Sequence, residues 1–289
     1  MSEDALTHHP AFYEFPLGAT PPEAGFSSDF SGARLRCQLM PYSNPNYPDV
    51  DEEYFEWIDI VESVLGAKGR YVLAELGAGY GRWAARAACL ARGRALQFHV
   101  IAVEAEPLHF QWLQETLRDN GVEPGEKTEI NAAVASGRGT AQFYVEADGG
   151  LNASSWYGQC IAFADTVGVE GTYAGRAVTK HASGCKSICV ETVTLPDILL
   201  PFPLVDLIDM DVQGEELAVV SSSLTTLNAK VRRLHIGTHS AEIEAGIRAV
   251  MASEGWQCIG DYPGHAKYKT LWGEIAFSDG VQSWVNPRL

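Results

Sequence analysis

The sequence predicts an α/β fold in which a mostly parallel sheet is covered by helices on both faces. Two observations lead to this prediction. Apolar segments with the length of strands alternate with amphipathic segments of helical period, and the strands are apolar throughout instead of alternating with polar residues. The chain has 289 residues, of which 46% are hydrophobic. It can therefore bury the core of one large domain with additions.

The first 50 residues differ in composition from the rest. They are rich in Pro, Gly, Ser and aromatic residues and show no sustained period. We interpret residues 1–50 as an irregular N-terminal arm or lid, and residues 51–289 as the folded domain. Within the arm, segment 42–47 is expected either to close over a ligand or simply to wrap the surface. The domain begins with a helix at Asp51, because the acids there suit a helix N-terminus.

Strands and helices then alternate along the domain. We expect strands at 71–76, 98–104, 128–135, 204–212, 231–239, 256–262 and 273–279. We expect helices at 81–93, 107–121, 214–229 and 241–255. Segment 139–146 is expected to form a hairpin with the third strand. Segment 147–190 is rich in Gly, Ser and aromatic residues without a clear period, and we interpret it as an active-site insertion.

Charge and composition restrict the partners. A net charge of −16 would repel a phosphate backbone, so we expect no nucleic-acid partner and favour a neutral or cationic small molecule. The N-terminus lacks the features of a signal peptide, and no apolar run is long enough to span a bilayer. The six scattered cysteines fit reduced thiols. We therefore expect a cytoplasmic protein without membrane contact, and a homodimer is left open.

A glycine-rich loop follows the first strand. It reads Glu75-Leu76-Gly77-Ala78-Gly79-Tyr80-Gly81, and Glu104 ends the next strand. Glycines at this turn let a ligand approach the backbone, while the second acid can accept hydrogen bonds from ribose hydroxyls. Arg82 stands where a dinucleotide fingerprint needs glycine, and no phosphate-binding G-K-[ST] follows. The loop thus indicates an adenosine-containing cofactor, the alternative being a tight turn beside a surface acid.

The spacing G-x-G-x-G after a leading acid resembles the first motif of class I methyltransferases that use S-adenosylmethionine. This resemblance implies that Glu75 holds the methionine ammonium, that Gly77 and Gly79 make room for the cofactor, and that Glu104 binds the ribose. The implied cofactor-binding set is completed by Ala78, Tyr80, Ala105, Ala133 and Asp211.

The later half of the chain narrows the resemblance to one family. Segments 194–199 (TLPDIL) and 205–216 (VDLIDMDVQGEE) are similar to the "TLDDLL" and "vDlIKIDVEGAE" stretches of FkbM-type methyltransferases, whose next strand ends in "E-x-H". The resemblance implies a Rossmann-like class I methyltransferase fold with seven strands. Three residues depart from the family pattern: Asp209 replaces Lys, Gln213 replaces Glu, and Gly237 replaces Glu.

Two polar residues at neighbouring strand ends form the candidate catalytic pair. Asp211 ends the fourth strand, and His239 ends the fifth, so both should lie at the rim where ligands of such sheets bind. We predict that His239 is the general base, because imidazole titrates near neutral pH. The alternative is a histidine satisfied by a neighbouring carboxylate. A further possibility is Mg²⁺ held by Asp211 and His239, although the fifth strand offers no acid.

Two other residues near this rim have open roles. Asp209 shares a strand face with Asp211, and we expect it either to pair with Arg232 or Arg233 or to join Asp211 and His239 around a divalent ion. We interpret His235 as a core histidine.

The function we expect is O-methylation of a hydroxyl on a sugar or small natural product by S-adenosylmethionine. The alternatives are methylation of a carboxylate or amine, a protein that binds the cofactor without turnover, and a nicotinamide-dependent dehydrogenase. Trp156 and Tyr157 are expected either to stack on a ligand or to pack locally.

Overall fold

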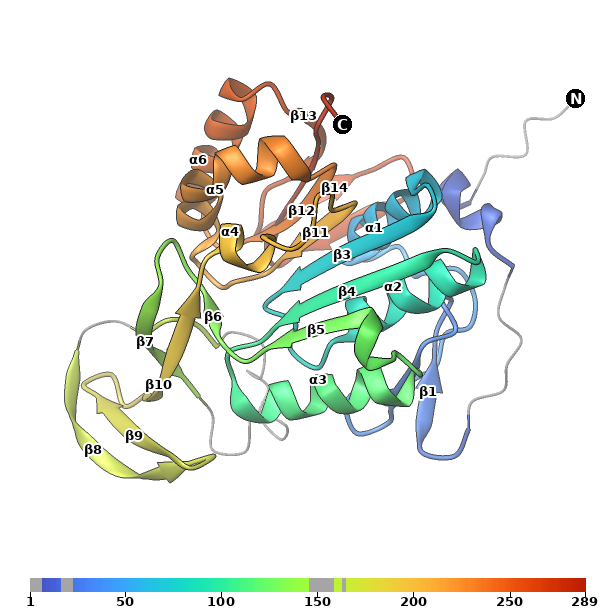
Figure 1. The fold of residues 1–289 in the computed structure, drawn as a ribbon. Coiled ribbons are helices and arrows are strands. Elements are labelled where there is room, and N and C mark those ends of the chain that lie inside the picture. The colour runs from blue at the N-terminus through green and yellow to red at the C-terminus, as the bar shows by residue number, and fades with distance from the viewer. Residues whose placement is uncertain (1–6, 17–22, 146–158, 163–164) are drawn as a thin grey trace, which may run out of the picture.

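The computed structural model describes residues 7–16, 23–145, 159–162 and 165–289, and a seven-stranded sheet lies at its centre (Figure 1). The strand order is β13-β16-β12-β11-β3-β4-β5. Neighbours from β12 to β5 are parallel, whereas β16 runs antiparallel to both β12 and β13. The strands are β3 Arg70–Leu76, β4 Gln97–Val103, β5 Lys127–Ile130, β11 Leu207–Met210, β12 Arg233–Thr238, β13 Gln257–Tyr262 and β16 Gly280–Val285. The predicted seven-stranded, mostly parallel sheet is confirmed.

Helices cover both faces of this sheet, as predicted. One face carries α1 Tyr54–Gly66, α2 Arg82–Gly93 and α3 Pro107–Asp119. The other face carries α4 Leu195–Ile198, α5 Glu216–Lys230 and α6 Ala241–Ser253. Side chains of β3 pack against the helices on both faces of the sheet, because successive side chains of a strand point to opposite faces. Tyr71 and Leu73 pack in the core below α1 and α2, whereas Val72 and Ala74 pack in the opposite core.

A second sheet lies beside the main one at the end near β5 (Figure 1). Its strands are β6 Ala133–Val134, β7 Gly139–Tyr144, β8 Thr166–Tyr173, β9 Arg176–His181 and β10 Lys186–Val193. β10 pairs parallel with β6 and antiparallel with β7 and β9. Segment 139–146 was expected to pair with the third strand, and this was wrong, since β7 pairs with β10. The described part of segment 147–190 also contains regular strands that its composition did not indicate.

The predicted strand 128–135 is divided between the two sheets. β5 ends at Ile130, and β6 begins at Ala133. Between them, the side-chain amide of Asn131 donates hydrogen bonds to the carbonyl oxygens of Glu104 and Ala105, at 2.9 and 3.2 Å. Asn131 thereby ties the point where the chain leaves the main sheet to the end of β4.

The last strand of the main sheet was also predicted wrongly. Residues 273–279 do contain a strand, β15 Glu274–Phe277, but it forms a separate hairpin with β14 Ala266–Lys269. The seventh position is taken by β16. Because buried Gly280, Gln282 and Ser283 interrupt its apolar pattern, periodicity alone did not identify it.

The N-terminal arm packs into the core of the domain. It contains a 3₁₀ turn, η1 Pro10–Glu14, and a short hairpin of β1 Phe26–Ser28 with β2 Arg34–Arg36. Phe12 and Phe30 are buried in the same cluster as α1 and α2. Tyr47, at the end of the segment that was considered as a lid, packs against this cluster.

One buried ion pair joins the arm to α2. The guanidinium of Arg86 is 1% exposed, and its Nε lies 2.7 Å from Oδ2 of Asp29. The same guanidinium lies over the rings of Trp57 and Trp83, at 4.3 and 4.1 Å from their centroids. Because the charge of Arg86 is removed from water, Asp29 is needed to neutralise it.

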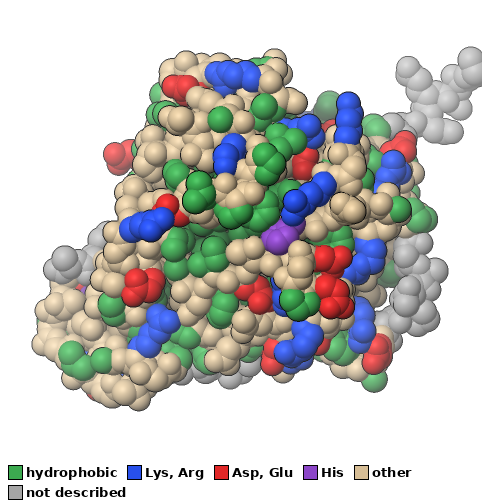
Figure 2. All heavy atoms as spheres, in the orientation of Figure 1, with side chains coloured by type: hydrophobic (Ala, Val, Ile, Leu, Met, Phe, Trp, Pro, Cys, Tyr) green, Lys and Arg blue, Asp and Glu red, His purple; other side chains and the backbone are tan. Residues whose placement is uncertain are grey.

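Charged and apolar side chains are mixed on the surface. Figure 2 shows acidic, basic and apolar side chains interspersed on one face, with no continuous basic area there. Within the described ranges, no helix combines the length and the apolar character needed to cross a membrane.

The Asp29–Arg86 pair gives the first prediction. We expect Asp29→Ala to lower the free energy of unfolding by about 3–5 kcal/mol, because it leaves the buried guanidinium with only Glu53, whose Oε2 lies 3.9 Å from Nη1, as its counter-charge. The measurement is urea denaturation followed by circular dichroism. Glu23→Ala serves as the control, since it removes an acid from the exposed Arg34–Glu23 pair of the same arm and should cost less than about 1 kcal/mol. Equal effects of the two variants would contradict the assigned role of Asp29.

Candidate active site

The glycine loop lies directly against the end of β11. A Cβ atom on Gly77 would be 1.8 Å from the carbonyl oxygen of Asp211, and its φ of +81° also favours glycine. The backbone N–H of Asp211 donates to the carbonyl oxygen of Leu76, at 2.9 Å. The loop and the strand end therefore pack backbone to backbone, and a side chain at position 77 would push them apart.

Glu104 holds the other side of this loop. Its Oε2 accepts a hydrogen bond from the backbone N–H of Gly79, and its Oε1 accepts one from Glu106, both at 2.7 Å. Burial raises the pKa of Glu104. Each carboxylate oxygen has a second lone pair, so Glu104 can position the loop and still accept hydrogen bonds from a ligand.

Two cavities adjoin at this loop. The first encloses about 610 Å³ and the second about 560 Å³, including their open mouths. They share Gly77, Gly79, His109 and Asp211. Every residue predicted to bind cofactor lines at least one of them: Gly77, Gly79, Glu104, Ala105, Ala133 and Asp211 line the first, and Glu75, Gly77, Ala78, Gly79, Tyr80 and Asp211 line the second.

Sequence reasoning missed part of the lining. The first cavity also includes His109, Val103, Ala132, Val134, Phe143, Gln159, Ile161, Val212 and Gln213. Phe143 belongs to β7 and Ile161 to the segment after it, so the second sheet closes this cavity. No local motif marks Phe143, because it reaches the cavity only through the pairing of β7 with β10. Trp156 and Tyr157, which were considered as stacking residues, lie outside the described residues.

Glu75 is a residue of β3, and its carboxylate lies at the N-terminus of α2. Its carboxylate accepts hydrogen bonds from the backbone N–H groups of Trp83 and Ala84, at 3.3 and 2.9 Å. Burial, followed by the negative charge of Asp209, raises the pKa of Glu75 to about 8. A cation in the second cavity would favour the ionised form of this carboxyl group.

The predicted pair Asp211 and His239 comes together with a third residue, Glu216. Nε2 of His239 lies 3.3 Å from Oδ1 of Asp211, and Nδ1 lies 2.8 Å from Oε1 of Glu216. Glu216 is fully buried, whereas the Asp211 side chain is 54% exposed. Asp211 lines both cavities, so the imidazole stands behind the carboxylate that faces them.

The pKa of His239 differs from the expected near-neutral value. Burial alone would lower it, but the hydrogen bond to Glu216 and the charges of Asp211 and Glu216 outweigh burial and raise it to about 9. At neutral pH the imidazole is therefore protonated, and it becomes a base only when the pH rises or a nearby positive charge lowers its pKa.

The Mg²⁺ site that was considered at Asp211 and His239 stays a prediction. Asp211, Glu216 and His239 each offer one possible ligand atom, and these atoms lie within 4.8 Å of one another. Glu216 also accepts hydrogen bonds from His239 and from the backbone N–H of Gly214. Mg²⁺ prefers oxygen ligands, and the same contacts fit an ion pair between His239 and two carboxylates.

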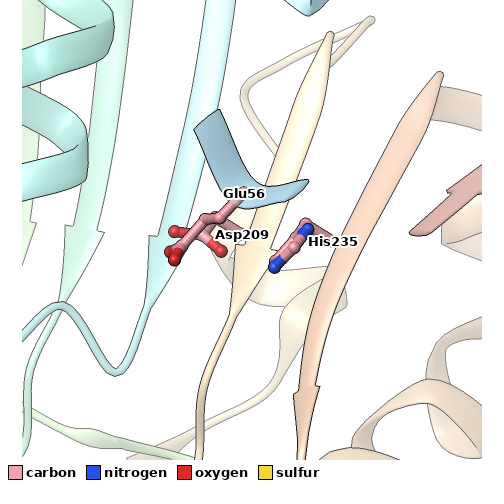
Figure 3. A group of neighbouring side chains, drawn as sticks. All are labelled: Glu56, Asp209 and His235. Carbon is pink, nitrogen blue, oxygen red and sulfur yellow. The ribbon is translucent and has the colours of Figure 1, made fainter. Parts of the chain in front are cut away.

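Asp209 has neither of the partners expected for it. Arg232 pairs with Asp206, and Arg233 pairs with Asp59 and Glu62. Asp209 lies instead beside Glu56 of α1 and His235 of β12 (Figure 3), in a group separate from that of Asp211, Glu216 and His239. Burial raises the pKa values of Glu56 and Asp209, and the charge of Asp209 raises that of Glu56 further.

His235 is buried, as expected for a histidine in the core. It is 4% exposed, and its Nδ1 lies 2.7 Å from Oδ2 of Asp59.

Comparison with known proteins gives a family match. The methyltransferase FkbM domain model matches residues 75–253. A protein from Jannaschia sp. (strain CCS1), described as "Putative methyltransferase", is 26% identical over 286 residues, which cover 96% of this chain and 98% of that protein.

Solved structures are more distant. Methyltransferase FkbM from Methylobacillus flagellatus KT is 14% identical with a TM-score of 0.45 over 75% of this chain, and the match spans only 44% of that longer chain. Precorrin-6y C5,15-methyltransferase from Geobacter metallireducens GS-15 is 9% identical with a TM-score of 0.42, over 79% of this chain and 86% of that chain.

The environment of His239 gives the second prediction. We expect the imidazole to titrate near pH 9 in the folded protein, and Glu216→Gln to move this midpoint toward the ordinary value because it removes the hydrogen-bonded negative charge. The measurement is an NMR titration of the histidine ring protons. Glu215→Gln makes the same charge change one residue earlier and should leave the midpoint in place.

The same pKa sets a pH dependence of stability. Because the folded pKa of about 9 lies above the ordinary value of 6.5, the contribution of His239 is complete below pH 6.5 and is lost as the pH rises through 9. Glu216→Gln should weaken this dependence. In the NMR titration, an unchanged midpoint for His239 in Glu216→Gln would contradict the hydrogen bond between these two residues.

Proposed function

The chain belongs to the FkbM methyltransferase family, and from this premise we propose that it transfers the methyl group of S-adenosylmethionine to a hydroxyl group of a sugar or small natural product. One observation carries the proposal: two cavities meet at the glycine loop and at Asp211. One cavity is suited to the nucleoside and the other to the methionine and the acceptor, so the reacting groups can meet between them.

The first cavity suits the adenosine part of this cofactor. Val103, Phe143 and Ile161 offer apolar contact to a base, and Glu104 offers a carboxylate to ribose hydroxyls. The close approach of Gly77 to Asp211 leaves the backbone accessible at the junction. These features support the cofactor-binding roles assigned to the loop.

The second cavity suits the positively charged part. Glu56, Glu75, Asp209 and Asp211 line it together with Arg82, which pairs with Glu53 at 2.7 Å. S-adenosylmethionine supplies a methyl group on a positively charged sulfonium and also carries an ammonium group. Acidic lining attracts both charges, and Glu75 is placed to hold the ammonium group.

Asp211 and His239 are proposed to receive the proton of the acceptor. The exposed carboxylate of Asp211 orients the acceptor hydroxyl, and its proton passes by way of Asp211 to Nε2 of the neutral imidazole of His239, which lies 3.3 Å behind that carboxylate. Bound S-adenosylmethionine would supply the methyl group to the acceptor oxygen, and its sulfur would keep the electron pair of the broken carbon–sulfur bond. Glu216 fixes the ring by its hydrogen bond to Nδ1. A sulfonium charge nearby would lower the pKa of His239 toward the working range.

Cofactor binding gives the third prediction. We expect Gly77→Ala to weaken binding of S-adenosylhomocysteine by about tenfold or more, because the added methyl group displaces the loop from Asp211. The measurement is isothermal titration calorimetry. Gly66→Ala is the control, since a Cβ atom at the end of α1 meets no atom within 4 Å. Wild-type affinity in Gly77→Ala would remove the structural basis of the proposed cofactor site.

Proton transfer gives the fourth prediction. We expect His239→Ala to lower turnover by about 10²–10⁴-fold while S-adenosylhomocysteine still binds. In the wild-type enzyme, kcat/KM should rise with pH toward about 9, because only neutral imidazole accepts a proton. The measurement is release of S-adenosylhomocysteine with a panel of sugars and hydroxylated natural products. Turnover within a few-fold of wild type in His239→Ala would show that the role is wrong.

A further inference from the structure

Glu56, Asp209 and His235 lie together beside the second cavity, and we propose that they bind a divalent transition-metal ion. Each offers one ligand atom, a carboxylate oxygen or an imidazole nitrogen, and these atoms all lie within 4.8 Å of one another. Figure 3 shows the two carboxylates pointing toward each other, with the imidazole on the adjacent strand.

The fold places these residues together by register. Asp209 on β11 is the direct neighbour of His235 on β12 and of Glu75 on β3. Side chains in register on adjacent parallel strands point to the same face. That face is covered by α1, which contributes Glu56. The group is therefore built from three elements of the rigid core.

The two carboxylates lie against each other. Asp209 is only 4% exposed, its side chain is hydrogen-bonded to that of Glu56, and the positive charge of Arg82 acts on both. Both line the second cavity. Two carboxylates in contact are costly unless a proton or a cation lies between them, so this position requires one or the other.

His235 supplies a separate indication of a ligand. Its Nδ1 lies 2.7 Å from Asp59, which is itself held by Arg233 and Ser283. This arrangement fixes the ring, while Nε2 has no hydrogen-bond partner within the described ranges. A carboxylate on one ring nitrogen, with the other nitrogen turned toward acidic groups, is the pattern that orients metal-binding histidines.

Charge and ligand type restrict the ion. Burial lowers the pKa of His235, but the hydrogen bond to Asp59 raises it overall, so a bound ion would take the place of a proton on this ring. The two carboxylates then balance a charge of +2. The mixed nitrogen and oxygen set favours Zn²⁺ or Mn²⁺ over Mg²⁺ and Ca²⁺, which prefer oxygen ligands. Glu56 and Asp209 face the second cavity, so the remaining positions of the ion would be open to water or to an oxygen atom of a bound molecule.

The test measures ion binding by the full-length protein, independently of methyl transfer. After treatment with EDTA and dialysis, the protein is titrated with Mn²⁺ and the free ion is followed by electron paramagnetic resonance. We expect one tightly bound Mn²⁺ per chain, with competition by Zn²⁺. Spin-echo spectra of bound Mn²⁺ should show coupling to an imidazole nitrogen, a readout that needs no variant.

Matched variants assign the site. Asp209→Asn and Glu56→Gln should each weaken Mn²⁺ binding by about 100-fold. Loss of a residue that only orients a metal ligand already weakens binding by about 10–100-fold, and these variants remove a ligand itself. Glu52→Gln, an exposed acid just before α1, should bind as wild type. Thermal unfolding of the EDTA-treated variants checks that they fold.

Three outcomes would overturn the proposal. The first is a wild-type protein that binds neither Mn²⁺ nor Zn²⁺, which would mean that Glu56 and Asp209 share a proton. The second is bound Mn²⁺ without nitrogen coupling. The third is binding that Glu216→Gln removes and Asp209→Asn does not, which would assign the ion to the group of Asp211, Glu216 and His239. Because ion binding is the readout, failure here would leave the proposed methyl transfer untouched.

Discussion

The contact between the backbone of Gly77 and the carbonyl oxygen of Asp211 governs the geometry of the site. A Cβ atom would have to lie 1.8 Å from that oxygen, so the loop can approach the strand only without a side chain. This approach brings the ends of β3 and β11 together, and both cavities open at that point. The glycine loop and the carboxylate of Asp211 therefore form one rigid unit at the carboxyl edge of the sheet.

Buried carboxylates around this unit differ mainly in what compensates their charge. Glu104 and Glu75 accept hydrogen bonds from backbone N–H groups and so hold the loop and the start of α2. Glu216 accepts one from His239 and raises the pKa of that imidazole. Asp209 differs from these residues, since its side chain is hydrogen-bonded to a second carboxyl group, that of Glu56. The same residue type thus has a structural role, an electrostatic role and, as we propose, a ligand role within one site.

Local patterns predicted what depends on local chemistry. The apolar strands, the glycine loop and Glu104 were readable because each follows from short-range rules for turns and burial. The lining role of Phe143 and the seventh strand β16 were not, because both depend on strand pairing between distant segments. The raised pKa of His239 could not be predicted from the sequence either. It depends on the hydrogen bond to Glu216, which comes from the start of α5. Asp209 was recognised as unusual, but its neighbour Glu56 lies 153 positions earlier in the numbering.

The docking of the arm has a practical consequence for protein engineering. Residues 1–50 look dispensable by composition, yet Asp29 neutralises Arg86 at the centre of α2, and α2 begins where Glu75 accepts two backbone hydrogen bonds. A chimera that joined the catalytic core of this chain to the leading segment of a relative would have to transfer Asp29 and its aromatic neighbours as well. The arm is thus part of the smallest transplantable unit.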